Sequence, residues 1–257
     1  MKTKLINFTN RSGQELSGRI EFPDIKQPHS FAIFAHCFTC NKNFSAVTNI
    51  CKALNNEGFA VLRFDFTGLG ESEGDFTETT FSSNIEDLLD AAGFLEKNHQ
   101  APSLIIGHSL GGAAAVFSAK LLDSVNAVVT IASSSSPDHL TKILGSVKEK
   151  ADEKGYAQAI IAGRKIILTK EFFEDISSKN MKEALGELRK PILIFHSPQD
   201  KLVGIENAAE IFIAAKHPKS FISLDGADHL LSDKRDSLFA GSIIAEWAKR
   251  YIMKTDE

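Results

Sequence analysis

The sequence predicts an α/β protein with a doubly wound, mostly parallel sheet and a small cap insertion. Short, nearly continuous apolar runs recur along the chain, as expected for strands that are buried on both faces of a parallel sheet. Stretches with helical spacing lie between these runs, and this alternation indicates a doubly wound sheet. The runs are Phe31–Ala35, Ala60–Phe64, Ser103–Ile106, Ala127–Ile131 and Ile192–Phe195.

The elements that flank these runs follow from local patterns. Residues 5–10 (LINFTN) and 16–22 (LSGRIEF) are split by the turn-like Arg11–Gln14, which predicts an antiparallel pair at the sheet edge. Apolar residues at helical spacing predict a helix over residues 85–95. A last helix is predicted to pack on the sheet through a face formed by Phe239, Ala240, Ile243, Ile244, Trp247 and Tyr251.

A cap is predicted at about residues 137–187, inserted after the run Ala127–Ile131. The alternation of strands and helices stops at Ser133, where a serine run leads into Pro137. Amphipathic stretches and the strand-like residues 164–169 (RKIILT) follow, and the sheet resumes at Pro191. No internal repeat or low-complexity linker interrupts the chain, so we expect residues 1–257 to form one domain.

Composition excludes several classes of function. The chain has 257 residues, a net charge of -4 and no cluster of basic residues, so we expect no nucleic-acid binding. No apolar run approaches the roughly 18 residues needed to cross a bilayer, and the apolar stretch near the N-terminus is too short for a signal peptide. We therefore expect a soluble cytoplasmic protein. Three cysteines are a poor basis for a disulfide framework, so reduced thiols are expected.

Residues 107–111 (GHSLG) fit the G-x-S-x-G pattern of a strained strand-to-helix turn that exposes a nucleophilic serine. They follow the run Ser103–Ile106 and precede a helix of small residues. Glycines are needed there because a side chain at position 107 or 111 would collide with the neighbouring strand or helix. Ser109 would stand at the helix N-terminus, where developing negative charge is favoured. The alternative is a glycine-rich turn with an incidental serine.

The serine needs a base, and the base needs a carboxylate that orients it. After a serine of this kind, the partners follow along the chain as an acid and then a histidine. Asp200 lies just past the run Ile192–Phe195, and His229 precedes the last helix. Asp228 adjoins His229, but neighbouring side chains diverge, and Asp225 is expected to tie its own turn. The sequence therefore predicts Asp200 as the acid and His229 as the base.

Several motifs together resemble the α/β-hydrolase superfamily across essentially the whole chain. They are DFTGLGES (65–72) with Gly74, GHSLGG, SPQDKLV and GADHLL. More narrowly, AHCFTCNKNFSA, LRFDFTGLGESEGDF and FSSNIEDL resemble the hydrolase half of bacterial proteins in which an α/β-hydrolase is fused to an OsmC-like peroxidase domain. The resemblance implies the α/β-hydrolase fold, the triad positions and a carboxylic ester hydrolase class, but no substrate. This chain departs from these proteins by ending at Glu257 with no OsmC-like domain, so the resemblance does not imply a peroxidase activity.

An oxyanion hole requires two N–H donors directed at the former carbonyl oxygen of the substrate. Leu110, the residue after the nucleophile, is expected to supply one. Phe38 is expected to supply the other from the loop after the run Phe31–Ala35. Relatives usually show His-Gly in this loop, whereas this chain has His36 and Cys37. His36 is expected to be a structural histidine.

Two further patterns suggest other chemistry. Cys37 and Cys40 form C-x-x-C, as in redox sites and in halves of zinc sites. A zinc site needs two more ligands, and Cys51 with scattered histidines does not supply a recognisable pair. A redox pair would open a helix, whereas these cysteines lie in the expected oxyanion loop, so we expect structural thiols and no metal. Gly68–Gly74 lacks the lysine of a phosphate-binding loop and is expected to shape the sheet edge.

These residues together predict a serine esterase that works through an acyl-enzyme without a cofactor. The expected partner is a small-molecule ester. In the cap, Phe172, Phe173 and Ile166–Leu168 are expected to line a small apolar site that prefers short acyl chains. A thioesterase or peptidase with the same triad is one alternative, and a non-catalytic hydrolase-like binding domain is another. The sequence leaves the oligomeric state open.

Overall fold

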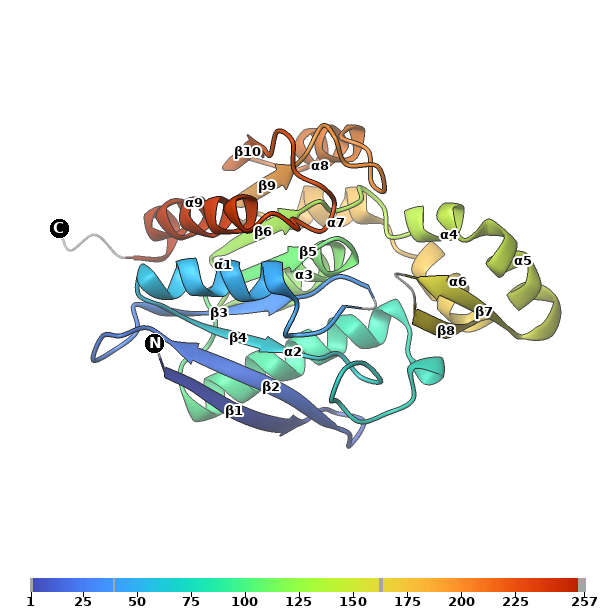
Figure 1. Cartoon of the computed structure of the whole chain (residues 1–257), viewed down its shortest axis with the longest axis horizontal. Coiled ribbons are helices and arrows are strands. Elements are labelled where there is room, and N and C mark those ends of the chain that lie inside the picture. The colour runs from blue at the N-terminus through green and yellow to red at the C-terminus, as the bar shows by residue number, and fades with distance from the viewer. Residues whose placement is uncertain (1, 39, 162–163, 254–257) are drawn as a thin grey trace.

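The structure is a computed structural model that describes residues 2–38, 40–161 and 164–253 (Figure 1). An eight-stranded sheet runs through its centre in the order β1-β2-β4-β3-β5-β6-β9-β10. Helices cover both faces of this sheet, which confirms the predicted doubly wound α/β fold.

The strands of the sheet, in chain order, are β1 (Lys2–Thr9), β2 (Glu15–Phe22), β3 (Ser30–Ala35), β4 (Phe59–Phe64), β5 (Leu104–His108), β6 (Ala127–Ile131), β9 (Ile192–His196) and β10 (Lys219–Ser223). The helices on its faces are α1 (Ser45–Asn56), α2 (Phe81–Asn98), α3 (Leu110–Leu121), α8 (Glu206–Ala214) and α9 (Lys234–Ile252), and a short 3-10 helix, η1 (Phe76–Glu78), precedes α2.

The central strands pair in parallel, from β4 through β3, β5, β6 and β9 to β10. Five of them coincide with the five apolar runs to within two residues at each end, and every residue of these five strands is buried. The predicted N-terminal antiparallel pair is also confirmed, since β2 pairs antiparallel with β1 and β4. Because parallel strands end on one side, their C-terminal loops share a single rim.

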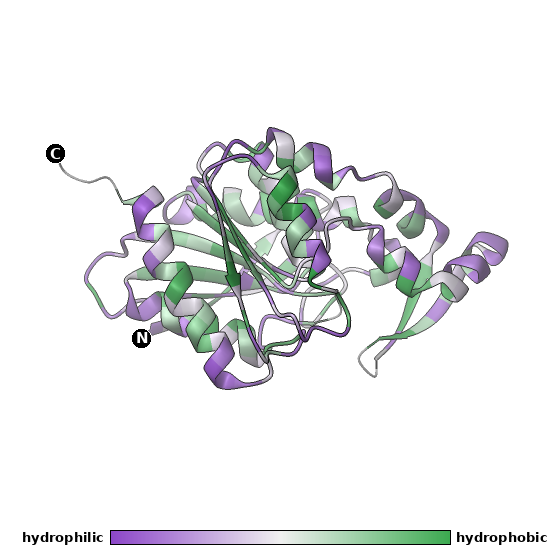
Figure 2. Cartoon of the chain, turned by 90° about the horizontal axis from the view of Figure 1, so that it is seen from above, coloured by the Kyte–Doolittle hydropathy of each residue, from purple (hydrophilic) through white to green (hydrophobic). Residues whose placement is uncertain are grey.

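Two apolar layers hold the helices to the sheet. α1 and α9 contribute to the layer on one face, and α2, α3 and α8 contribute to the layer on the other. Figure 2 shows hydrophobic residues along the central strands and hydrophilic residues on the outer sides of the helices. The last helix packs on the sheet as predicted except at Phe239. Its side chain is 51% exposed because it lies outside the buried face of the helix, which Ala240, Ile244 and Ala248 form. No helix in the described ranges is long and apolar enough to cross a membrane.

A small insertion separates β6 from β9, as the sequence predicts. It comprises α4 (His139–Ile143), α5 (Gly145–Lys154), β7 (Tyr156–Ile161), β8 (Arg164–Thr169), α6 (Lys170–Ser177) and α7 (Met181–Glu187). β7 and β8 form a separate antiparallel hairpin. In Figure 1, α4, α5, α6 and this hairpin lie at the right, beyond the C-terminal ends of the parallel strands, while α7 returns to the sheet. The insertion therefore lies over the rim whose loops carry the predicted site residues.

Candidate active site

Ser109 lies in the sharp turn between β5 and α3, with φ 55° and ψ -123°. This positive φ is strained for a residue with a side chain and is maintained by close packing around the turn. A Cβ at Gly107 would lie 2.1 Å from the Gly111 carbonyl oxygen, and a Cβ at Gly111 would lie 2.4 Å from the His36 carbonyl oxygen. The predicted reason for both glycines is therefore confirmed.

Three side chains from separate parts of the chain meet at this turn. His229 Nε2 lies 3.0 Å from Ser109 Oγ, and His229 Nδ1 lies 2.7 Å from Asp200 Oδ2. Asp200 follows β9, while His229 lies in the loop between β10 and α9. The histidine can thus accept the serine proton on one nitrogen while its other N–H donates to the carboxylate.

The carboxylate of Asp200 is held from both sides. Its second oxygen, Oδ1, accepts the N–H groups of Leu202 at 2.8 Å and Val203 at 3.0 Å. Burial by itself raises the pKa of Asp200, but the hydrogen bonds from His229 and from these N–H groups outweigh it, so the pKa lies below its usual value. Asp200 therefore stays ionised beside the imidazole at neutral pH.

The competing acids are engaged elsewhere. Asp228 is exposed, and its Oδ1 accepts the N–H of Ser232 at 2.8 Å. Asp225 is also exposed and accepts the hydroxyl of Ser223. The hydrogen bond to the His229 ring thus comes from Asp200.

Two histidines that the sequence analysis did not assign brace the loops of the site. His108 Nε2 donates to the carbonyl oxygen of His229 at 2.7 Å, and His196 Nε2 donates to the carbonyl oxygen of Val203 at 2.8 Å. Burial, reinforced by the nearby His229 ring, lowers the pKa of His108 to about 3, so it is neutral. The available signal was position, because His108 ends β5 and His196 ends β9, each directly before a loop of the site.

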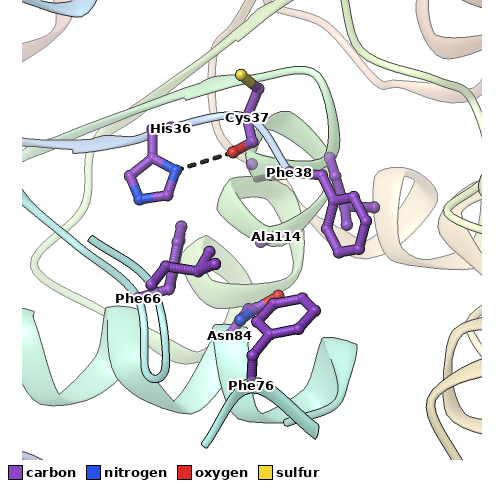
Figure 3. Close-up of a pocket in the computed structure, with 10 residues that line it drawn as sticks. His36, Cys37, Phe38, Phe66, Phe76, Asn84 and Ala114 are labelled. Carbon is purple, nitrogen blue, oxygen red and sulfur yellow. Dashed lines mark hydrogen bonds between the residues drawn. The ribbon is translucent and has the colours of Figure 1, made fainter. Parts of the chain in front are cut away.

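The two residues expected to form the oxyanion hole, Leu110 and Phe38, line the same cavity as Ser109. Leu110 is the first residue of α3, a position whose N–H has no acceptor within the helix. His36 Nδ1 donates to the Cys37 carbonyl oxygen at 2.8 Å, as Figure 3 shows. This carbonyl and the N–H of Phe38 belong to one planar peptide unit, so the His36 hydrogen bond contributes to the orientation of that N–H.

The cysteines of the same loop differ from the expectation. Cys37 and Cys40 form a disulfide, with Cα atoms 5.3 Å apart, rather than two reduced thiols. The Cys40 N–H donates to the Cys37 carbonyl oxygen at 3.0 Å, and this turn brings the two residues within the range for a disulfide. Cys51 is free and buried in α1. Within the described residues, no group of three or more His, Cys, Asp or Glu is placed to hold a metal ion.

A buried ion network, also missed by the sequence analysis, ties this loop to the loop after β4. Lys42 and Asp65 are each 1% exposed. The Lys42 N–H donates to Asp65 Oδ1 at 2.6 Å, and its Nζ donates to Asp65 Oδ2 and to Glu71 Oε2. A Cβ at Gly70, which has φ 57°, would lie 2.2 Å from the Asp65 carboxylate. The glycine-rich segment therefore closes over Asp65 at the end of β4.

A cavity of about 920 Å³ opens at the serine, between the rim and the insertion. Ser109, His229, Phe38 and Leu110 all line it. The predicted acyl-site lining is wrong, because none of the five expected cap residues is among the described residues that line the cavity. Phe172 and Phe173 instead face the core, and the Phe172 ring lies 5.6 Å from the Phe38 ring. The lining from the insertion comes from Leu140, Ile143, Leu144, Ile160 and Ile161.

The chain is similar to known hydrolases. A family model described as serine aminopeptidase, S33, matches residues 28–154. The esterase domain of a Rhodothermus marinus protein is 44% identical, with a TM-score of 0.81, and the match covers 98% of this chain and 100% of that one. Est1E of Butyrivibrio proteoclasticus, solved with ferulic acid, is 20% identical, with a TM-score of 0.79 over 97% of this chain and 100% of that one, and supports the fold alone.

A curated relative carries a different activity in its name. The mouse mitochondrial palmitoyl-protein thioesterase ABHD10 is 33% identical over 110 residues, which are 42% of this chain. The match spans only 34% of the length of that relative.

Proposed function

The chain belongs to the α/β-hydrolase superfamily, and from this premise we propose that it is a serine esterase that cleaves small-molecule carboxylic esters through an acyl-enzyme. The observation that carries the proposal is the hydrogen-bonded series Ser109, His229 and Asp200 at the cavity. A nucleophile, a base and an orienting carboxylate within hydrogen-bond reach are what acyl transfer to a serine requires.

In the proposed reaction, Ser109 Oγ attacks the ester carbonyl carbon as His229 Nε2 takes the hydroxyl proton. Asp200 keeps Nδ1 protonated and stabilises the imidazolium. The N–H groups of Leu110 and Phe38 stabilise the oxyanion that forms on the former carbonyl oxygen. His229 then returns the proton to the leaving alcohol, and the acyl group stays on Ser109.

Deacylation uses the same groups in reverse. A water molecule replaces the alcohol, His229 removes its proton as it attacks the acyl-enzyme, and the second tetrahedral intermediate expels Ser109. The acid product leaves and the free serine regains its proton. Every step is a proton transfer or an acyl transfer, so the sequence of steps requires no cofactor.

Thioester hydrolysis is the second candidate. The 33% identity to a palmitoyl-protein thioesterase over 110 residues favours it. Both reactions need the same triad and oxyanion donors, and they differ in the leaving group that His229 protonates. Substrate comparison is therefore needed to separate them.

The test combines covalent labelling with turnover. We expect a fluorophosphonate probe to label Ser109, and Ser109→Ala to abolish both labelling and the hydrolysis of p-nitrophenyl esters while thermal unfolding stays cooperative. Ser134→Ala, a change of another serine in the same cavity, is the matched control and should keep labelling. An acyl-thioester and a peptide substrate run in parallel assign the leaving group. A folded wild-type protein that the probe does not label would refute the proposal.

A further inference from the structure

We propose that the cavity beside Ser109 binds an unbranched aliphatic chain of about eight carbons or more, either as the acyl part or as the alcohol part of its ester. This inference rests on the proposed function, because the ester bond has to lie at Ser109. It replaces the short-chain preference that the sequence suggested, whose supporting residues do not line the cavity.

The first support is volume. The cavity has a volume of about 920 Å³, near the upper end of the roughly 300–1,000 Å³ of sites for drug-sized ligands. If each carbon of a chain occupies about the volume of a water molecule, roughly 30 Å³, a butyryl group fills about 120 Å³ and a decanoyl group about 300 Å³. A short acyl group would leave most of the apolar wall in contact with water.

The second support is the chemistry of the wall. The apolar side chains that line the cavity come from the insertion on one side and from the loops of the rim on the other. They include Pro137, Leu140, Ile143, Leu144, Ile160 and Ile161 from the insertion, and Phe38, Phe44, Leu110, Leu202, Val203 and Leu230 from the rim. Such a wall binds a chain by removing apolar surface from water, without directional contacts.

The third support is exposure. Ile143, Ile160 and Leu202 remain 44%, 68% and 51% exposed, although all three line one cavity. Large apolar side chains that gather around a hollow and are not buried by folding indicate a surface that a ligand covers. The chain of the ester is the ligand that the adjacent triad implies.

The charges around the cavity also fit an uncharged chain. Apart from histidines, the charged side chains among the described lining residues are Lys201 and Asp228. Both are exposed, and Asp228 already accepts the N–H of Ser232. Neither is a buried charge that would require a partner on the substrate.

The experiment compares two ester series. One varies the acyl chain of p-nitrophenyl esters from C4 to C12, and the other varies the alcohol chain of alkyl acetates, followed by titration of released acid. Full burial of a methylene contributes about a fourfold change in binding, so we expect kcat/KM to rise at least about tenfold from C4 to C10 in one series. The series that responds assigns the cavity to the acyl or the alcohol side. A flat or falling profile in both series overturns the inference.

Matched variants locate the effect. Ile143→Asp and Ile160→Asp, each on the cavity wall, should lower the C10 to C4 ratio of kcat/KM at least about fivefold. Ile167→Asp is the control, because Ile167 lies on β8 of the same insertion, is 40% exposed and does not line the cavity. Equal ratios in the wall variants and in the control would count against the inference.

A binding measurement keeps the two proposals distinguishable. Calorimetric titration of the wild-type protein with decanoate and butanoate, and with decanol and butanol, reports chain recognition without turnover. We expect the C10 member of at least one pair to bind at least about tenfold tighter than its C4 member. Tighter binding of the C10 member without any ester hydrolysis would refute the esterase proposal and keep the chain site. Ester hydrolysis with no chain-length dependence in kcat/KM or in binding would refute the chain site alone.

Discussion

At the residue scale, the acid that contacts the His229 ring is decided by the direction of the side chains rather than by separation along the sequence. Asp228 is covalently adjacent to His229, yet it accepts the N–H of Ser232, whereas Asp200 contacts the ring from a different loop. A carboxylate that stays ionised stabilises the imidazolium formed during attack, and its loss in a serine protease costs about 10⁴ in kcat.

We therefore predict that Asp200→Asn lowers kcat by at least about two orders of magnitude. Asp228→Asn should cost about tenfold or less, because the amide oxygen of asparagine can still accept the Ser232 N–H. Steady-state kinetics on one p-nitrophenyl ester compares the two. If the variants exchanged ranks, the assignment of the acid would be wrong.

His36 does not line the cavity at Ser109, yet it can act on the proposed reaction through a neighbouring peptide unit. Its hydrogen bond to the Cys37 carbonyl oxygen orients the peptide unit that carries the Phe38 N–H. An oxyanion donor acts mainly in the transition state, so a change in its orientation affects kcat more than KM.

We predict that His36→Leu lowers kcat about tenfold or more while KM changes less than about threefold. His36→Asn, which keeps a side-chain N–H donor, should recover part of the lost kcat. The two kinetic constants are measured on the same ester as above. An equal loss in both variants, or a change confined to KM, would argue for a purely structural histidine.

At the scale of elements, the loop after β3 is attached to the loop after β4 by a buried ion pair. Lys42 and Asp65 are almost fully removed from water and close on each other through two hydrogen bonds. Removal of one partner from a buried pair leaves the other charge without compensation, which is far more costly than the loss of a surface pair.

We predict that Lys42→Met lowers the free energy of unfolding by about 3 kcal/mol or more. Lys148→Met removes a partly exposed pair with Asp152 on α5 and should cost less than about 1 kcal/mol. Urea denaturation of both variants and of the wild type gives these values. Equal destabilisation by the two variants would mean that the Lys42 pair contributes no more than a surface pair.

At the scale of the whole molecule, burial of neutral histidines couples stability to pH. The pKa of His108 is about 3 in the folded protein, below its ordinary value of 6.5. Between these values the unfolded chain binds a proton that the folded protein does not bind, so the free energy of unfolding rises with pH through this window. One such group contributes at most about 1.4 kcal/mol per pH unit.

We predict that His108→Gln makes the free energy of unfolding less dependent on pH between about 4.5 and 6.5 than it is in the wild type. The same change at exposed His217 controls for the loss of a histidine. Chemical denaturation at several pH values gives the slopes. Identical slopes for the wild type and His108→Gln would contradict the depressed pKa.

The sequence by itself determined the parts of this protein that depend on neighbours along the chain. Burial of both faces of a parallel strand requires a continuous apolar run, so β3, β4, β5, β6 and β9 could be predicted closely. The turn at Ser109 could also be predicted from neighbouring residues, because the glycines that it requires, Gly107 and Gly111, lie within two residues of the serine. The order of strands and motifs also predicted that Asp200 and His229 lie at the same rim of the sheet as Ser109.

Only the tertiary structure decided which distant groups make contact. His108 bonds the carbonyl of a residue 121 positions away, and Lys42 pairs with Asp65 across 23 positions. Phe172 and Phe173 lie on the buried face of α6, and their apolar character did not indicate whether they meet the core or the cavity. A local pattern indicates which residues of a short segment are buried. It does not indicate which distant segment buries them, because the free energy of burial is not directional. These contacts therefore depend on how separate segments pack.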